Sequence, residues 1–501
     1  MKKLLGPLSA SAGALLLSAS GFLSYLIGFF RDILLANIFG ASTETDAFYS
    51  AFLLPDFLFS FLILGFVSGS LLPVFSHAEK KSKRRAENIF HSFLTLVLLF
   101  STIFSAIAFF AAPSILHALF PEKNIHETVY LTRILLLSPI FFGISNTLGT
   151  VLLAKKRFFS MAISPALYNI GIIGGILLFG ERYGIQAGAW GAVCGALLHL
   201  LSRLLDFPRT GIALQVSLRF LPELREIFWL GLPKTIGLIA FQASIIVFTV
   251  LAAHTETGGV AAWNFARNIQ SLPVSLFGIA FATAALPFFA DAKSQKQPKQ
   301  FAVQLEKSIL QILLFTLCSA VGMSIMGKGI VSVLFQHGAF TAFAGAITTA
   351  ILVPLAFATP FEGLMHLFSR AFLAHKKTVF PAMGRVLFFL LSSASALLFL
   401  PLLGIGALGL AFAIAAAGEC IFLFIAFHFR CAPVTISPRN IFSVLLLTAV
   451  VAAGITTISF SPLPVNDVVR LGIALVVSAG IFFTGLSLLH ITAVKELFFR
   501  K

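Results

Sequence analysis

Charged side chains occur within stretches of this sequence that are otherwise apolar. In the segment Gly28–Phe75, Arg31, Asp32, Asp46 and Asp56 fall inside or beside two apolar runs. A charge at the depth of the hydrocarbon is costly, so such residues usually face a bundle interior or a water-filled cavity. The segment therefore predicts two membrane helices that enclose something polar.

A second group of charges interrupts the apolar runs of the C-terminal half, namely Lys234, Glu362, Arg370 and Arg385. Opposite charges within a membrane tend to pair. We therefore expect Glu362 to pair with Lys234 or Arg385, either as a gate that opens and closes or as a pair that only stabilises the bundle. Asp32 follows Arg31 directly, about 100° around a helix, so both cannot point at one ligand. This favours a structural ion pair for Asp32.

Patterns typical of enzymes and metalloproteins do not stand out in the sequence. The 11 histidines are scattered without metal-ligand spacing, and the 4 cysteines form no CxxC pair. We expect no catalytic residues, no metal and no cofactor. The net charge of +16 comes without a nucleic-acid-binding motif, so we expect no nucleic-acid partner.

Composition indicates a membrane protein. The 501 residues are 58% hydrophobic and only 11% charged, whereas soluble domains are about a quarter charged. Apolar runs long enough to cross about 30 Å of hydrocarbon recur from end to end. The fold class we expect is an all-α polytopic membrane protein in contact with membrane lipids.

The apolar runs predict about fourteen spans. Their approximate limits are 8–39, 46–75, 89–119, 129–154, 158–180, 184–205, 230–253, 259–289, 301–326, 340–374, 379–400, 403–427, 441–460 and 468–489. If both termini are cytoplasmic, the outer loops hold only Lys123, Arg182, Lys328 and Arg470, as the positive-inside rule requires. The first run is longer than the apolar part of a signal peptide, so we expect an uncleaved helix.

An internal repeat divides the chain. Residues 43–75 begin Thr-Glu-Thr and end Leu-Pro-Val-Phe, and residues 255–289 begin Thr-Glu-Thr and end Leu-Pro-Phe-Phe. The offset covers six helices, an even number, so both copies have the same orientation in the membrane. We expect four parts: a six-helix lobe at 1–206, an amphipathic interfacial linker at 207–229, a second six-helix lobe at 230–430, and two extra helices with a basic tail at 431–501.

Five segments of the sequence resemble the MurJ/MviN family of lipid II flippases, which belongs to the multidrug/oligosaccharidyl-lipid/polysaccharide exporter superfamily. They are GFFRDILLANIFGA (28–41), TDAFYSAFLLPD (45–56), GFVSGSLLPVF (65–75), NFARNIQSLPVSLFGIAFATAALPFFA (264–290) and FQHGAFTAF (335–343). The resemblance implies that the chain moves lipid II, a lipid-linked pyrophosphate precursor, from the cytoplasmic to the outer leaflet of the bacterial inner membrane. Alternating access would drive this step of cell-wall synthesis, and other cell-wall synthesis proteins are possible partners.

The resemblance also implies three substrate-binding residues, because the cavity charges of the family match here at Arg31, Asp46 and Arg267. The planar guanidinium forms paired hydrogen bonds with phosphate and never deprotonates. We therefore expect Arg31 and Arg267 to clamp the pyrophosphate. Asp46 begins the second span, where it either complements the start of the helix with Thr45 or forms a gating ion pair at the outer opening.

The sequence departs from the family pattern at several positions. Tyr25, Phe59 and Leu64 stand where the family commonly has charged residues. Spans seven and eleven hold Lys234 and Arg385 but no Asp, Glu or Asn, which speaks against the cation site described for some members. Two alternatives therefore stay open: an exporter of another lipid-linked oligosaccharide or of amphipathic drugs, and a non-transporting scaffold for cell-wall assembly. A membrane-embedded enzyme would need a metal-binding carboxylate pair or a His cluster in a sizeable loop, and no outer loop reaches that size.

Overall fold

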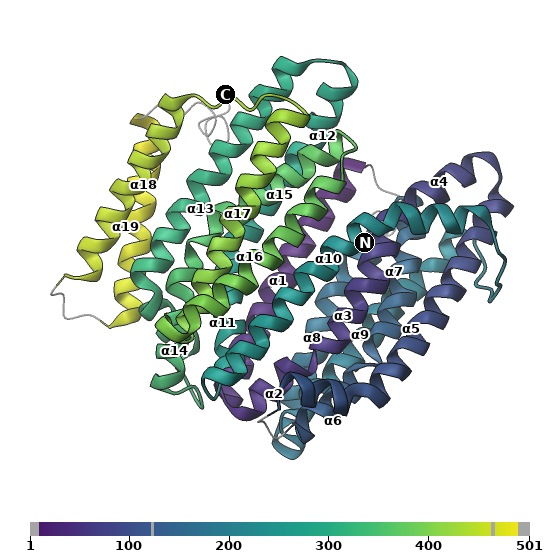
Figure 1. The fold of residues 1–501 in the computed structure, drawn as a ribbon, viewed down its shortest axis with the longest axis horizontal. Coiled ribbons are helices and arrows are strands. Elements are labelled where there is room, and N and C mark those ends of the chain that lie inside the picture. Colours follow the sequence, from purple (N-terminus) through teal and green to yellow (C-terminus); the bar gives the residue numbers. More distant parts are fainter. Residues whose placement is uncertain (1–9, 122–124, 462–465, 489–501) are drawn as a thin grey trace. The chain divides into compact units, whose positions relative to one another are not determined.

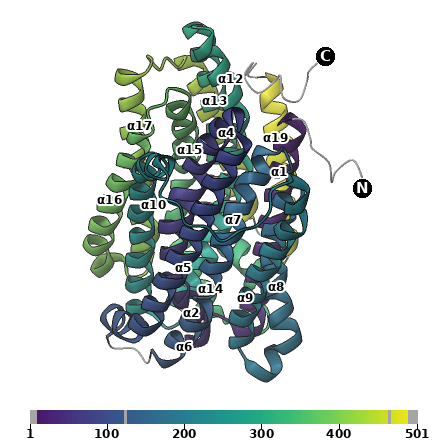
Figure 2. The same ribbon diagram turned by 90° about the vertical axis from the view of Figure 1, so that its right-hand side faces the viewer.

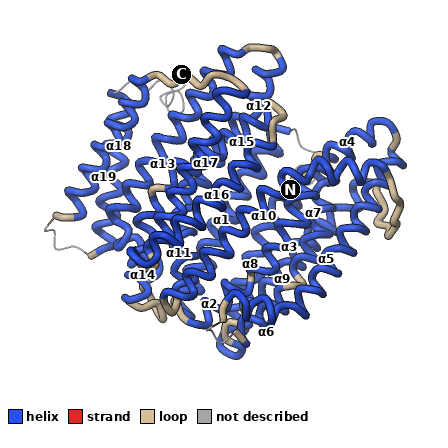
Figure 3. Tube along the Cα trace, viewed as in Figure 1, coloured by secondary structure: helices blue, strands red, loops and turns tan. Residues whose placement is uncertain are grey.

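Helices make up almost all of the structure, which is a computed structural model that describes residues 10–121, 125–461 and 466–488. No strand occurs in these described ranges (Figure 3). The all-α prediction is confirmed. The basic N-terminus at residues 1–9, Lys123 and the basic tail at 489–501, on which the expected topology partly depends, lie outside the described residues.

The fourteen-span prediction is also confirmed. Within the described ranges, 13 helices are long and apolar enough to cross a membrane, and a bent pair forms one more span. This pair consists of α14 (Ala342–Ala356) and α15 (Ala358–Ala374), which meet at 50°. Pro360 explains the bend, because its ring nitrogen cannot donate to the carbonyl of Ala356 four residues earlier.

The chain forms two compact units, of which unit 1 consists of Met1–Leu35 and Ser42–Val260. Its first element, α1 (Ala10–Phe39), ends in a turn that belongs to unit 2. The other elements of unit 1 are α2 (Thr43–Ala51), α3 (Leu53–Leu58), η1 (Phe59–Leu71), α4 (Leu72–Lys81), α5 (Lys83–Leu119), α6 (His126–Leu135), α7 (Ser138–Ala154), α8 (Phe159–Tyr183), α9 (Gln186–Asp206), η2 (Phe207–Thr210) and α10 (Pro222–Thr255).

Unit 2 consists of Ala36–Ala41 and Ala261–Lys501. Figure 2 shows its helices α16 and α17 beside each other, and Figure 1 shows α18 beside α19. Residues of α13, α18 and α19 share one apolar core that includes Leu314, Val444 and Val451. Besides α14 and α15, the elements are α11 (Gly259–Pro273), η3 (Val274–Ile279), α12 (Ala280–Ser294), α13 (Pro298–Phe335), α16 (Val379–Leu403), α17 (Gly406–Arg430), α18 (Pro438–Ser459) and α19 (Asp467–Leu488).

Helix α10 packs against η1 and therefore groups with unit 1. The repeat-based division of the sequence instead places most of this helix in the second lobe, residues 230–430. Contacts group helices by what they touch, whereas a repeat groups them by descent, so the two divisions need not coincide. The lobe limits inferred from the repeat stay a prediction.

The repeat reappears as an unusual backbone feature. The second helix of each copy contains a π-helical segment, η1 in the first and η3 in the second. Pro73 follows η1 and Pro273 precedes η3. A proline lacks the donor that continues an α-helical ladder, which explains a shift of hydrogen-bond register nearby.

The linker expected at 207–229 is not one continuous helix. A short 3₁₀ helix, η2, ends at Thr210, and the chain is not helical again until α10 begins at Pro222. The backbone N–H groups of Ser217 and Arg219 donate to side chains of α5 instead of to a helical ladder. Between residues 214 and 220, every second residue is apolar. Two of these, Val216 and Phe220, are 82% and 92% exposed.

One turn of unit 2 depends on close backbone contact with the end of α1. The N–H of Ala339, in the turn between α13 and α14, donates to the carbonyl of Asn37 at 2.8 Å. The preceding Gly338 has φ +58°, and a Cβ there would collide with the same carbonyl. Glycine is therefore required in this turn, which lies within the FQHGAFTAF segment.

Candidate functional site

Arg31 lies in α1 of unit 1 and pairs with the next residue. Its Nη2 and Nε donate to Oδ1 of Asp32 at 2.8 and 3.0 Å, and its Nη1 donates to Oδ1 of Asn169 on α8 at 3.1 Å. Tyr49 on α2 donates its hydroxyl to the same Asp32 oxygen at 3.1 Å. The Asp32 side chain is 2% exposed, whereas that of Arg31 keeps 20%. Asp32 is thus buried as an ion-pair partner, and Arg31 remains accessible.

Asp46 lies in the first turn of α2, whose N-cap is Ser42. The Ser42 hydroxyl accepts the N–H of Thr45 at 3.3 Å, so Ser42 and not Thr45 caps this helix. Oδ2 of Asp46 accepts the N–H of Gly258 at 2.8 Å. The carboxylate thus joins the start of α2 to the turn between α10 and α11. A gating role for Asp46 stays a prediction.

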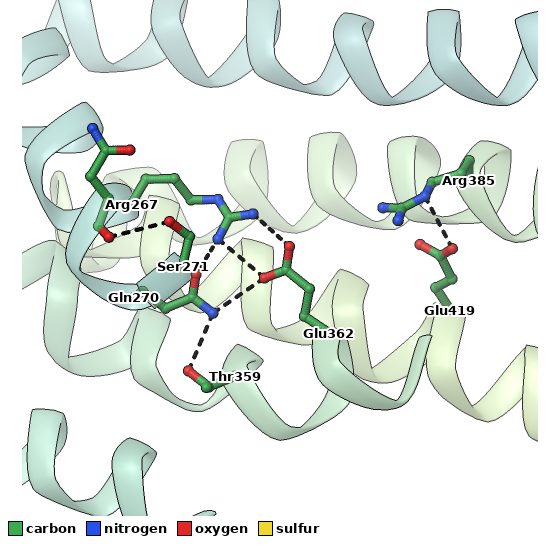
Figure 4. A network of polar contacts seen from close by, with 8 residues as sticks. Arg267, Gln270, Ser271, Thr359, Glu362, Arg385 and Glu419 are labelled. Atoms are coloured by element: carbon green, nitrogen blue, oxygen red, sulfur yellow. Dashed lines mark hydrogen bonds and ion pairs between the residues drawn. The ribbon is translucent and has the colours of Figure 1, made fainter. Parts of the chain in front are cut away.

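Arg267 lies in α11 of unit 2, where Glu362 of α15 holds it in a two-point ion pair (Figure 4). Nη2 and Nη1 of Arg267 donate to Oε1 and Oε2 of Glu362 at 2.6 and 3.1 Å. Gln270 donates its amide to the same carboxylate and to Thr359, and accepts a hydrogen bond from Arg267. The guanidinium also lies 4.4 Å from the centre of the Phe412 ring.

This arrangement corrects the expected partners of Glu362. Its carboxylate binds Arg267, and Arg385 on α16 instead pairs with Glu419 on α17, with 3.4 Å between Nε and Oε1 (Figure 4). The sequence cannot distinguish these partners, because it does not say which helix faces which. Glu419 is 1% exposed, and its Oε2 has no hydrogen-bond partner.

Lys234 follows Pro233 in α10, and its side chain is exposed. It belongs to unit 1, as do Arg31, Asp32 and Asp46, whereas Arg267, Glu362 and Arg385 belong to unit 2. Each unit therefore contributes one of the two arginines expected to bind the cargo. The clamp that joins them stays a prediction.

Two acidic residues within spans have no role that the sequence alone reveals. Asp56 in α3 lines a cavity in unit 1. Glu419 lies within the apolar run 403–427, where an acid carries the same signal as Glu362 does in its own span. His366 also lies within electrostatic range of Arg385, Glu362, Arg370 and Arg267.

Phe59, one of the departures from the family pattern, packs edge-on against Phe142 with 5.3 Å between ring centres. It lines the same cavity as Asp56. At position 59, where the family commonly has a charged residue, this chain therefore has an aromatic ring that lines the cavity. Across the described ranges, no group of three or more His, Cys, Asp or Glu residues has the arrangement of a metal site.

Relatives of this chain are lipid II flippases by name. The Lipid II flippase MurJ of Thermosipho africanus is 27% identical over 425 residues, which is 84% of this chain and 86% of the relative. A Probable lipid II flippase MurJ of Buchnera aphidicola is 26% identical over 340 residues, and this match spans 64% of each chain.

Solved structures agree on the fold. One described as Lipid II flippase MurJ, inward closed conformation, superposes with a TM-score of 0.81 at 23% identity, covering 95% of this chain and all of the other. An inward-facing MATE family transporter of the MOP superfamily gives a TM-score of 0.70 at 15% identity, covering 82% of this chain and 94% of the other. These likenesses show a shared transporter fold.

The family assignment follows from a match along most of the chain. The family model Lipid II flippase MurJ aligns with residues 35–478. Its members are transporters of the inner membrane, which agrees with the many membrane spans and the intramembrane arginines. This chain belongs to the MurJ family of lipid II flippases, and it is a multi-pass membrane transporter, not an enzyme.

Proposed function

We propose that this protein carries lipid II from the cytoplasmic to the outer leaflet by alternating access, with Arg31 and Arg267 as the two pyrophosphate ligands. One observation carries the proposal: each unit holds one arginine within a membrane span, paired with a carboxylate yet still accessible. The Arg31 and Arg267 side chains keep 20% and 18% of their surface. A charge kept within a span and partly accessible is typical of a ligand site.

The chemistry of the cargo suits this arrangement. Lipid II joins a pyrophosphate and a polar sugar-peptide head to an apolar tail. Two guanidinium groups can hold the pyrophosphate by paired, charge-assisted hydrogen bonds while the tail stays in lipid. The Phe412 ring supports the Arg267 guanidinium from one face, which orients its remaining donors.

Two repeat lobes, residues 1–206 and 230–430, alternate in this proposal between cytoplasmic and outer access. Both termini are cytoplasmic, and the basic loops at residues 80–85 and 155–157 support this orientation. Other cell-wall synthesis proteins are candidate partners. Cysteine labelling from outside intact cells tests the orientation, because an introduced cysteine beside Arg182 should react and one beside Lys156 should not.

Rescue of bacteria depleted of their own lipid II flippase tests the function. We expect the wild-type chain to restore growth, and we expect Arg31→Ala and Arg267→Ala to abolish rescue at normal protein levels. Arg182→Ala serves as the matched control, because Arg182 stands at the end of α8 and contacts the ring of Tyr183.

Lipid II that reaches the outer leaflet, measured by its accessibility to an added degrading enzyme, provides a second readout. Failure of well-inserted wild-type protein to raise this accessibility would count against lipid II as the cargo. Full rescue by both alanine variants would instead remove the arginine clamp while leaving the cargo intact.

A further inference from the structure

Unit 1 contains a cavity of about 240 Å³ that the proposed pyrophosphate site does not use. Its walls come from α3, η1, α6, α7 and α8 and from Phe52 between α2 and α3, all of which belong to this unit. Three oxygen-bearing side chains and three phenylalanine rings matter for its chemistry: Asp56, Ser138, Tyr168, Phe52, Phe59 and Phe142.

The acidic residue in this cavity has no partner of its own. Asp56 is accessible, and the described part of the structure gives its carboxylate no ion pair and no side-chain hydrogen bond. Arg31 lies within electrostatic range of Asp56, but the Arg31 charge is already balanced by Asp32 at 2.8 Å. A bound cation would stabilise such a carboxylate within a membrane span.

A second group points to a ligand independently. Ser138 lines the cavity and is only 5% exposed, and its hydroxyl oxygen is buried without a hydrogen-bond partner. Buried hydroxyl groups in proteins are nearly always satisfied, so an unsatisfied one beside a cavity points to a ligand within its reach. The α7 backbone holds Ser138 in the first turn of its helix.

Aromatic rings make up much of the wall. Phe142 packs edge-on against both Phe59 and Tyr168, with ring centres 5.3 and 5.2 Å apart. The faces of aromatic rings carry partial negative charge and attract cations, organic ammonium groups among them.

The type of cation follows from the number of oxygen ligands. Calcium takes six to eight oxygen ligands, and magnesium needs an octahedral set. This cavity has only three oxygen-bearing side chains, Asp56, Ser138 and Tyr168. A primary ammonium group instead has three N–H donors and an apolar neighbourhood on its carbon side.

We propose that this cavity binds a primary ammonium group, with Asp56 as its counter-ion, Ser138 as a hydrogen-bond acceptor and the aromatic side chains as its apolar wall. The ammonium belongs either to a free amine or to an amine on the peptide part of a lipid-linked cargo. The second source rests on the proposed function. The cavity is then a second anchoring point for the head group, separate from the pyrophosphate ligands.

Calorimetric titration with n-pentylamine tests the binding on the full chain in lipid nanodiscs, with empty nanodiscs as the blank. We expect saturable binding to the wild type and no comparable binding of n-pentanol, which has the same shape without the charge. Asp56→Asn should weaken amine binding by about tenfold or more, because a charge-assisted hydrogen bond is lost. Ser138→Ala should weaken it less.

Glu44→Gln is the matched control, because Glu44 is an exposed acid in the same membrane span and outside the cavity. It should bind the amine like the wild type. Equal binding by Asp56→Asn and the wild type would overturn the proposal, as would the absence of n-pentylamine binding. Displacement of the amine by sodium at equal concentration would overturn the choice of an organic cation.

Transport of two lipid-linked cargoes, one with a free amine and one with that amine acetylated, separates the two sources. If the head group supplies the ammonium, Asp56→Asn should slow only the cargo with the free amine. If Asp56→Asn slows neither cargo yet still loses n-pentylamine binding, the ligand is a free amine. Because the titration needs no lipid II, failure of the proposed function leaves its result unchanged.

Discussion

Asp46 and Gly258 are joined by a hydrogen bond of 2.8 Å and occupy the same place in the two copies of the repeat, 212 residues apart. The first copy reads Thr-Glu-Thr-Asp from residue 43 and the second reads Thr-Glu-Thr-Gly from residue 255. The carboxylate of one copy thus binds the backbone of the other at the matching residue. Gly258 in the second copy has φ +80°, a backbone conformation that aspartate would adopt only with strain.

Loss of this bond should affect stability more than transport. We expect Asp46→Ala to lower the free energy of unfolding by about 1–3 kcal/mol, because the N–H of Gly258 loses a charged acceptor. Asp46→Asn keeps an oxygen acceptor and should retain most stability and transport. Thermal unfolding in detergent and the rescue assay measure the two effects. A gating ion pair would show the opposite pattern, with Asp46→Asn stable but inactive.

Removal of the negative charge next to Arg267 should destabilise unit 2. We expect Glu362→Gln to cost about 2–3 kcal/mol, near the lower end for broken buried pairs, since the Arg267 side chain is 18% exposed. Ser369→Ala is the matched control on the same helix, because the Ser369 hydroxyl donates to the carbonyl of Met365 in its own helix. Melting temperatures should fall for the first variant and stay unchanged for the second. If Glu362→Gln melted at the same temperature as the wild type, the ion pair between Arg267 and Glu362 would not contribute to stability.

The turn at Gly338 offers a test of backbone strain. We expect Gly338→Ala to destabilise the protein by about 1–3 kcal/mol, since alanine disfavours φ +58° and its Cβ would collide with the Asn37 carbonyl. Gly322→Ala in α13 is the matched control, because a Cβ there meets no atom within 4 Å. That substitution should stabilise the helix by about 0.5–1 kcal/mol. Comparable losses in both variants would rule out the turn as the cause.

The loop after α15 should make stability depend on pH. Burial, with the positive charges of Lys293 and Lys377, lowers the pKa of His375 despite its hydrogen bond to the Ala371 carbonyl. As the pH falls, His375 therefore takes up its proton at a higher pH in the unfolded chain than in the folded protein. The folded state loses stability as the pH falls below about 6.5, the ordinary histidine pKa. Melting temperatures between pH 7.5 and 5.5 should fall less for His375→Gln than for the wild type. Parallel curves would contradict this assignment.

The sequence predicted the fold because membrane helices are encoded locally. An apolar run of sufficient length must be a helix in lipid, and loop charges orient it. The mixed composition of the linker at 207–229 does not predict its non-helical stretch at 211–221. The period of two in Leu214, Val216, Leu218 and Phe220 does, because it does not suit a helix. The backbone N–H groups of Ser217 and Arg219 then found partners on α5, more than 120 residues earlier in the chain.

Residues of the candidate site were predictable as charges but not as pairs. The sequence favoured a structural ion pair for Asp32 without naming a partner, and in the structure that partner is the adjacent Arg31. Glu362 lies 95 residues from Arg267, and only the tertiary packing that brings α15 beside Arg267 selects that partner. The cavity around Asp56 could not be predicted from the sequence for the same reason, since its walls come from five separate helical elements.

The two-point pair between Arg267 and Glu362 also bears on how fast a carrier can work. In the proposed function, an anion that reaches this arginine competes with a carboxylate that already takes two of its hydrogen bonds, so its net gain is smaller than at an arginine in contact with water alone. Cargo binding would then be weaker, and its release faster, than at an arginine without a carboxylate partner. The carboxylate of Glu362 would act as a competitor of the cargo that favours turnover over affinity.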